Sequence, residues 1–329
     1  MELEWIQTVR KKAVKIPVNK IAQEGGKLIF KVCRYLLLAG ISYLMIYPVM
    51  TMLSTALSRP IDLYNESTVW IPKNPTFTNF TSALRYFDYA HHLGITVSIS
   101  TISTALQMLV CPLVGYGLAR YRFKGNGLVF AMVIMTIIVP IQTAQIPMYL
   151  DYQAFDFLGI GRLIGLITGE PLTVNLLNTN WVYYIPAAFG VGLRSGLYIF
   201  LFRQYFKGMP KDLEDAGKVD GCSRFGIYLR IIIPNAKPVF VTEFLLSMIF
   251  YWNDTVISNM LLNTVNVQPL MPYTRRLMEL QNTVDQIEEM QSRAEGMACL
   301  FMTVAPLMIL FIVCQKFFIE CMDRSGIKG

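Results

Sequence analysis

The sequence predicts an all-α, polytopic membrane protein with six transmembrane helices. Hydrophobic residues make up 54% of the 329 residues and charged residues only 16%, whereas a soluble domain carries about 25% charge. The mean hydropathy is +0.44. The apolar residues also gather in blocks of about 20 or more, which a water-soluble core does not require. These observations argue against a soluble enzyme, a disordered chain and a disulfide-stapled secreted domain.

Six apolar stretches account for the predicted spans. A helix needs about 20 residues to cross roughly 30 Å of hydrocarbon. The stretches of sufficient length are residues 29–57, 93–119, 128–150, 181–206, 239–262 and 297–318. Each is expected to be helical, because lipid offers no hydrogen-bond partner to the unpaired backbone groups of other structures.

The distribution of Lys and Arg predicts the orientation of these spans. With the N-terminus inside, the inner segments hold 21 basic residues and the outer segments hold 7. Cytoplasmic segments carry the excess of Lys and Arg in membrane proteins, so both termini are predicted to be cytoplasmic. The same bias explains the net charge of +7 without a nucleic acid as partner.

Residues 1–28 are a basic segment ahead of the first span. Two interpretations stay open for it: a partly amphipathic segment on the inner leaflet, or a loosely ordered cytoplasmic tail. A cleaved signal peptide is not favoured, since the apolar run that follows is about twice the length that such peptides use.

The sequence offers no pattern for a metal site or for covalent chemistry. The six cysteines lie mostly in or beside apolar stretches, and no pair has CxxC spacing. His91 and His92 are the only histidines, so a histidine-based metal site would need carboxylates from elsewhere. There is no GxxxxGK[ST] phosphate loop, HExxH, nucleophile elbow or dinucleotide-binding glycine motif. We therefore expect no metal, no catalytic residues and no enzymatic activity.

The segment 208–238, between the fourth and fifth stretches, predicts a compact pair of helices on the inner side. Pro210 suits the first turn of a helix, and the acidic residues that follow favour the positive end of its dipole. Gly221 allows the positive φ of a tight stop, and Ser223 is placed to cap a second helix. Pro234 then breaks or redirects the chain toward the fifth span.

This segment resembles the cytoplasmic coupling loop of permease subunits of ATP-binding-cassette (ABC) importers. That loop has the pattern Glu-Ala-Ala, three residues, Gly, then a hydrophobic helix that ends near Pro. The residues at matching positions are Glu214, Ala216, Asp220, Gly221, Phe225, Pro234 and Pro238. Two residues depart from the pattern: Asp215 replaces the first Ala, and Gly217 directly follows the motif, where it should weaken the helix by up to about 1 kcal/mol relative to Ala.

Further short matches, in the same order along the chain, resemble the maltose-type permease subunits. The matching segments are 74–80, 118–125, 177–181, 251–254 and 326–329. The resemblance implies that residues 29–329 form one transmembrane domain with the type I ABC importer permease fold, containing the coupling loop 208–238.

What the resemblance implies is a subunit of an ATP-driven carbohydrate importer in the bacterial inner membrane. A second permease subunit would complete the path as a heterodimer, two ATP-binding subunits would hold ATP and Mg²⁺, and an extracytoplasmic solute-binding protein would deliver an oligosaccharide. This chain would itself hold no cofactor. The residues expected to couple to the ATPase are Glu214, Asp215, Ala216, Gly217, Asp220, Gly221 and Pro234.

Five residues at membrane depth are candidates for the sugar path. Arg194 lies in the fourth stretch, and Asn253 and Asp254 lie in the outer part of the fifth. Polar groups are expensive in lipid and usually face a cavity or a partner. Tyr251 and Trp252 are of the type that stacks on a sugar face. The alternatives are an aromatic belt at the membrane interface and an ion pair between Arg194 and a partner subunit.

Two other functions stay open from the sequence. One is a permease for another solute, such as a polyol or glycerol phosphate, and the other is a membrane scaffold outside the ABC class. A proton-coupled carrier has little support, because Glu243 and Asp254 alone do not make a relay of intramembrane acids.

Overall fold

The computed structural model describes residues 18–64, 71–86, 88–280 and 286–326. Within these ranges every regular element is helical, and the only β contact is an isolated antiparallel bridge between Phe155 and Val174. The predicted all-α class is thus confirmed. The predicted N-terminal segment 1–28 lies partly outside the described residues, and from Val18 onward it already belongs to the first described helix.

The helices differ widely in length, and several short ones connect the long ones. In chain order they are α2 (Val18–Leu57), η1 (Pro60–Tyr64), α3 (Thr78–Tyr86), α4 (Tyr89–Arg120), α5 (Asn126–Ile138), η2 (Ile141–Ala144), α6 (Gln145–Gln153), η3 (Phe157–Gly159), α7 (Ile160–Thr168), α8 (Trp181–Ala188), α9 (Ser195–Gly208), α10 (Asp212–Val219), α11 (Arg224–Ile227), η4 (Tyr228–Ile232), α12 (Ile233–Asn235), α13 (Lys237–Trp252), α14 (Val256–Leu261), η5 (Val265–Val267), α15 (Leu270–Leu280) and α16 (Gln286–Gly326).

Three helices are long and apolar enough to cross a membrane by themselves. They are Gly26–Leu57 within α2, the whole of α4, and Met290–Lys316 within α16. Two pairs of helices qualify only if each pair is one bent span: α5 with Ile141–Gln153, bent by 97°, and Arg224–Asn235 with α13, bent by 76°. The part of the chain that the structure describes therefore holds three to five candidate spans, and the predicted count of six stays a prediction.

Three of the predicted spans are interrupted rather than continuous. The third bends at Pro140, which lacks a backbone donor and disfavours a helical conformation for the residue before it. The fourth is divided into α8 and α9 by a connection in which Gly190 and Arg194 adopt φ values of +70° and +60°. The fifth breaks after α13, where the Asp254 carboxylate accepts a hydrogen bond at 3.1 Å from the backbone N of Ser258, in the first turn of α14.

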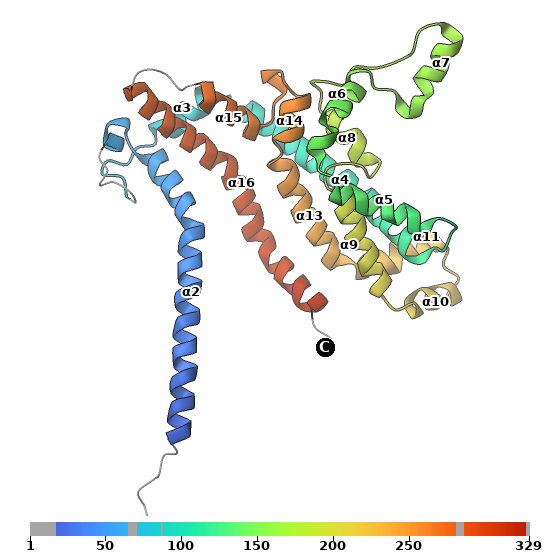
Figure 1. The fold of residues 1–329 in the computed structure, drawn as a ribbon, viewed down its shortest axis with the longest axis horizontal. Coiled ribbons are helices and arrows are strands. Elements are labelled where there is room, and N and C mark those ends of the chain that lie inside the picture. Colours follow the sequence, from blue (N-terminus) through green and yellow to red (C-terminus); the bar gives the residue numbers. More distant parts are fainter. Residues whose placement is uncertain (1–17, 65–70, 87, 281–285, 327–329) are drawn as a thin grey trace, which may run out of the picture.

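α4 is the central helix of the bundle (Figure 1). It packs against α8, α9 and α13, and α13 in turn packs against α16. One end of α4 lies in a hydrophobic cluster with α9, including the fully buried Phe202 and Phe206, and the other end lies in a second cluster with Tyr183 and Tyr251. Because lipid is as apolar as these side chains, close packing and hydrogen bonds rather than the hydrophobic effect hold such helices together.

Figure 1 places α10, the first turns of α2 and the last turns of α16 toward one end of the bundle, and α3, α7 and α15 toward the other. The predicted coupling segment and the ends of the described chain thus share one face. Which face meets the cytoplasm stays a prediction from the Lys and Arg distribution.

Candidate functional site

The segment 208–238 folds into short helices that lead into α13, and much of its local chemistry is as predicted. α10 carries three acidic residues in its first turn, although Pro210 stands before this turn rather than in it. Gly221 adopts φ +76°, the conformation that favours glycine at the end of a helix. Ser223 caps α11, because its hydroxyl accepts a hydrogen bond from the Gly226 backbone N at 3.1 Å.

The second helix of this segment is not regular. A single α-helical turn, α11, passes into the π-helical turn η4 and then into α12. Pro234 has no N–H to donate to the carbonyl of Arg230 one turn earlier, and its ring crowds that carbonyl. A widened turn is the usual response to such a lost bond. Pro234 therefore shapes the backbone locally, before the chain turns into α13.

Gly217, a departure from the coupling-loop pattern, is buried where α10 meets α11 and η4. A Cβ atom at this position would lie 2.6 Å from Ile231 Cδ1 and 3.1 Å from Ile227 Cγ1. A larger residue would push the two helices apart or displace both isoleucines. The helix propensity lost at Gly217 is thus offset by close packing between the two halves of the segment.

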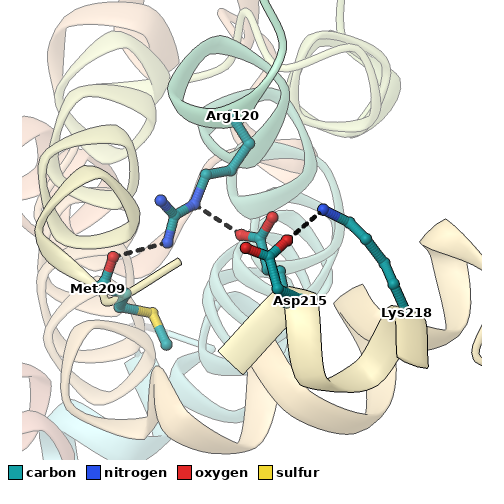
Figure 2. A network of polar contacts seen from close by, with 5 residues as sticks. Arg120, Met209, Asp215 and Lys218 are labelled. Carbon is teal, nitrogen blue, oxygen red and sulfur yellow. Dashed lines mark hydrogen bonds and ion pairs between the residues drawn. The ribbon is translucent and has the colours of Figure 1, made fainter. Parts of the chain in front are cut away.

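Arg120, the last residue of α4, joins three helices at this face (Figure 2). Its Nε lies 2.7 Å from Glu214 Oε1 in an ion pair, and its Nη2 donates a hydrogen bond to the Met209 carbonyl at 2.8 Å. The two charged side chains are only 7% and 13% exposed. Glu214, predicted to contact the ATPase, thus faces its own chain here.

Asp215 and Lys218 form a second ion pair on the exposed part of α10, close to Glu214, with 2.6 Å between Oδ1 and Nζ (Figure 2). The hydrogen bond from Lys218 lowers the pKa of Asp215 below its usual value, and the same bond raises the pKa of Lys218. Both groups are therefore charged at neutral pH. The pair is lost as the pH falls through the lowered pKa of Asp215, and because both side chains are exposed it adds little to stability.

Most of the predicted coupling residues that are exposed lie on or directly after α10, and Gly221 and Pro234 are exposed as well. We call the exposed side of α10 the coupling surface; its residues are Leu213, Asp215, Ala216, Val219 and Asp220. Val219 is 88% exposed, which is unusual for a valine with apolar neighbours in the same segment. By contrast, Gly217 is buried within the segment.

Three of the five predicted path residues lie inside the subunit and bond to it. The Tyr251 hydroxyl accepts a hydrogen bond from the Leu193 backbone N at 3.2 Å, and Trp252 Nε1 donates to the Thr303 carbonyl at 3.0 Å. The Asp254 carboxylate accepts from the Tyr183 hydroxyl at 2.6 Å. These contacts join α13 to the connection before α9, to α16 and to α8.

Arg194 and Asn253 are exposed, and the structure does not bring them into direct contact with each other. The Arg194 guanidinium lies over the Phe250 ring, 5.1 Å from its centre. Asn253 donates from Nδ2 to the Ile249 carbonyl at 2.9 Å. Their remaining polar atoms are accessible to a ligand or to a partner subunit.

A buried polar network, not anticipated from the sequence, links the three central helices. Gln107 of α4 donates from Nε2 to Ser195 Oγ at 2.7 Å and to the Leu193 carbonyl at 2.9 Å. Its Oε1 accepts a hydrogen bond from Ser247 of α13 at 2.7 Å. One turn away on α13, Glu243 is fully buried, and neither of its carboxylate oxygens has a hydrogen-bond partner among the described residues.

The two histidines hold the other end of α4. His91 Nε2 lies 2.8 Å from the Asn266 carbonyl, and His92 Nδ1 lies 2.7 Å from the Gln268 carbonyl. Thr96, one turn further along α4, accepts a hydrogen bond from the Leu270 backbone N at 2.8 Å. No group of three or more His, Cys, Asp or Glu among the described residues is arranged to hold a metal ion.

A solved structure defines the class of this fold. The chain superimposes on a subunit in the crystal structure of a bacterial ABC transporter involved in the import of the acidic polysaccharide alginate. The TM-score is 0.71 at 20% sequence identity, over 89% of this chain and 98% of the other. The chain therefore shares the fold of that transporter chain.

Residues 112–324 match the family of the "Binding-protein-dependent transport system inner membrane component". The chain belongs to this family. The match includes α9, the whole of the segment 208–238 and most of α16, so the residues of the coupling surface lie inside the family's own domain.

Curated relatives are similar over nearly their whole length. The arabinooligosaccharides transport system permease AraQ of Halalkalibacterium halodurans is 26% identical over 88% of this chain and 94% of its own. The probable starch degradation products permease AmyC of Thermoanaerobacterium thermosulfurigenes is 24% identical, over 88% and 93%. The melibiose/raffinose/stachyose import permease MelC of Bacillus subtilis is 26% identical, over 86% and 91%. The chain is a permease of this transport family, a multi-pass protein of the bacterial inner membrane.

Proposed function

We propose that this chain is one transmembrane subunit of an ATP-driven oligosaccharide importer and that it couples to a separate ATPase through the segment 208–238. The exposed coupling surface on α10, at one end of the bundle, carries this proposal. The names of the relatives, which refer to arabinooligosaccharides, starch degradation products and melibiose, raffinose or stachyose, support the choice of an oligosaccharide.

The partners follow from the same proposal. A second permease subunit forms the other half of the path, two ATP-binding subunits hold ATP and Mg²⁺ at the cytoplasmic face, and an extracytoplasmic solute-binding protein delivers the sugar. Both termini are cytoplasmic in this arrangement. Aliphatic side chains that stay exposed on α5, among them Leu128, Met132 and Met135, are suited to lipid or to the second permease subunit.

Within the coupling segment the predicted residues divide into two roles. Asp215, Ala216 and Asp220 lie on the coupling surface and meet the ATPase, with Val219 as an apolar contact. The other predicted residues shape the segment: Gly217 and Gly221 set its packing and its turn, and Pro234 sets its exit. ATP-driven closure of the ATPases then moves the segment and the helices attached to it.

Co-purification of the ATP-binding subunit with the assembled importer tests this role. Burial of a valine side chain contributes about 1.5–3 kcal/mol, so Val219→Asp is expected to weaken ATPase binding about tenfold or more. Ala216→Trp should do the same by blocking close approach. Phe123→Ser is the matched control, since Phe123 is an exposed apolar residue of the connection between α4 and α5. If both α10 variants retain the ATPase as well as the control does, the proposed coupling role is wrong.

A further inference from the structure

We propose that Arg120 is a positioning residue that fastens the coupling helix α10 to the inner end of α4, and that Glu214 acts mainly as its partner within this chain. The inference rests on the proposed function, since it concerns how movement of α10 reaches the transmembrane helices. It assigns to Glu214 a different task from the direct ATPase contact expected from the sequence.

The first argument is geometric. One guanidinium reaches two partners that belong to successive helices: the Met209 carbonyl, directly after the end of α9, and the Glu214 carboxylate, in the first turn of α10. The contact with Met209 is a hydrogen bond from Nη2, whereas the contact of Nε with Glu214 is an ion pair without hydrogen-bond geometry. The extended, charged guanidinium of Arg spans both partners at once, whereas the ammonium of Lys is a compact point charge. Figure 2 shows the Arg120 side chain extending between Met209 and α10.

The second argument concerns burial. Glu214 is 13% exposed and Arg120 is 7% exposed, whereas the neighbouring pair Asp215–Lys218 is about 60% exposed on each side chain. A buried charge that loses its partner carries a large desolvation cost, and salt screens it little. The α10 helix therefore has a strong link on the side facing α4 and a weak one on the side facing solvent.

The third argument is that α4 is itself tied to the helices that would have to move. Gln107 bonds to the start of α9 and, through Ser247, to α13. Beyond Arg120, Asn126 Nδ2 donates to the Tyr121 carbonyl at 2.9 Å and holds the exit of α4 against the start of α5. A displacement of α10 that keeps the Arg120–Glu214 pair intact thus carries α4 with it.

The experiment uses the complete reconstituted importer with its ATP-binding and solute-binding subunits. We compare Arg120→Gln, Glu214→Gln, the double variant and the charge exchange Arg120→Glu with Glu214→Arg. Arg122→Gln is the matched control, because Arg122 is an exposed arginine two residues further along the same connection. The readouts are sugar transported per ATP hydrolysed, and the spread of distances between spin labels at Leu113 on α4 and at Asp212, an exposed residue of α10 outside the coupling surface.

Each single variant is expected to lower the transport-to-hydrolysis ratio about tenfold and to broaden the label distances. The double variant should be no worse than either single one, since both remove the same contact. The charge exchange should recover at least part of the transport-to-hydrolysis ratio and narrow the spread of distances between the labels again. This comparison holds even if Arg120→Gln alone assembles poorly. Arg122→Gln should behave as the unaltered chain.

Two results would overturn the inference. One is an Arg120→Gln importer with the coupling ratio and label distances of the control, in which case the coupling role of α10 still stands. The other is loss of ATPase binding in Glu214→Gln with unchanged label distances, which would assign Glu214 to the ATPase contact. A failure of the proposed function would be recognised by a different result, namely that the Val219→Asp and Ala216→Trp variants retain the ATPase.

Discussion

At the scale of single residues, the structure separates predicted path residues that bond within the subunit from those that are exposed to a ligand. Tyr251, Trp252 and Asp254 attracted attention in the sequence because polar and aromatic groups are expensive at membrane depth. Each turns out to have a partner inside the subunit. Arg194 and Asn253 are the two exposed residues of the set. We propose these two as the sugar contacts of this subunit.

Removal of these two side chains therefore tests the path. A hydrogen bond that involves a charged group contributes about 1.5–3 kcal/mol, so Arg194→Gln is expected to raise the sugar concentration for half-maximal transport by about tenfold or more, and Asn253→Ala by somewhat less. Uptake of labelled sugar by proteoliposomes measures this. Arg59→Gln, at an exposed position after α2, makes the same change away from the path and serves as control. If the sugar concentration for half-maximal transport is unchanged in both variants, Arg194 and Asn253 are not sugar contacts.

At the scale of elements, the sequence predicted turns and helix caps correctly, but it did not predict contacts between residues far apart in the chain. Gly221 and Ser223 could be assigned their roles from the sequence, because a positive φ and a helix cap depend on neighbouring residues only. Arg120 and Glu214 are far apart in the sequence, and nothing in either segment names the other. The breaks at Arg194 and Asp254 were also missed, since an apolar stretch reads alike whether its helix is continuous or interrupted.

The close contact at Gly217 gives a prediction for α10 as a unit. Gly217→Leu forces a side chain against Ile227 and Ile231 and is expected to destabilise the segment by about 1–3 kcal/mol. Transport should fall together with ATPase binding, because the coupling surface is displaced as a whole. Gly127→Leu is the matched control, since a Cβ at Gly127 in α5 meets nothing within 4 Å. Thermal unfolding of the purified importer and co-purification of the ATPase report the two effects; a variant equal to the control in both contradicts the packing argument.

At the scale of the whole molecule, composition and charge were enough to predict a helical membrane protein but not the number and continuity of its spans. The excess of apolar residues gave a helical membrane protein, and the order of short matches gave its family, both of which the comparisons support. The number of spans did not follow, because the 97° bend divides the third predicted span and the α8–α9 and α13–α14 breaks divide the fourth and fifth, each of which hydropathy treats as one rod. Orientation rests on the 21 basic inner residues against 7 outer ones.

Labelling of single cysteines in a background without the native ones tests this orientation. Lys124→Cys, at an exposed site in the connection between α4 and α5, should react with a membrane-impermeant maleimide only from the cytoplasmic side, and Ile71→Cys, at a site 81% exposed before α3, only from the outside. Intact cells and inside-out vesicles distinguish the two. Reaction of Lys124→Cys in intact cells would reverse the topology and, with it, the position of the ATPase.

The attachment at the far end of α4 has a consequence for how this chain can evolve. His91, His92 and Thr96 all reach main-chain atoms of residues 266–270, not the side chains of that segment. Replacing the Asn266 side chain therefore leaves the three bonds in place, whereas inserting or deleting one residue moves the two carbonyls and the Leu270 N–H out of register. Packing still restricts the buried Gln268 and Leu270, but for these three bonds the number of residues in the segment counts for more than their identity.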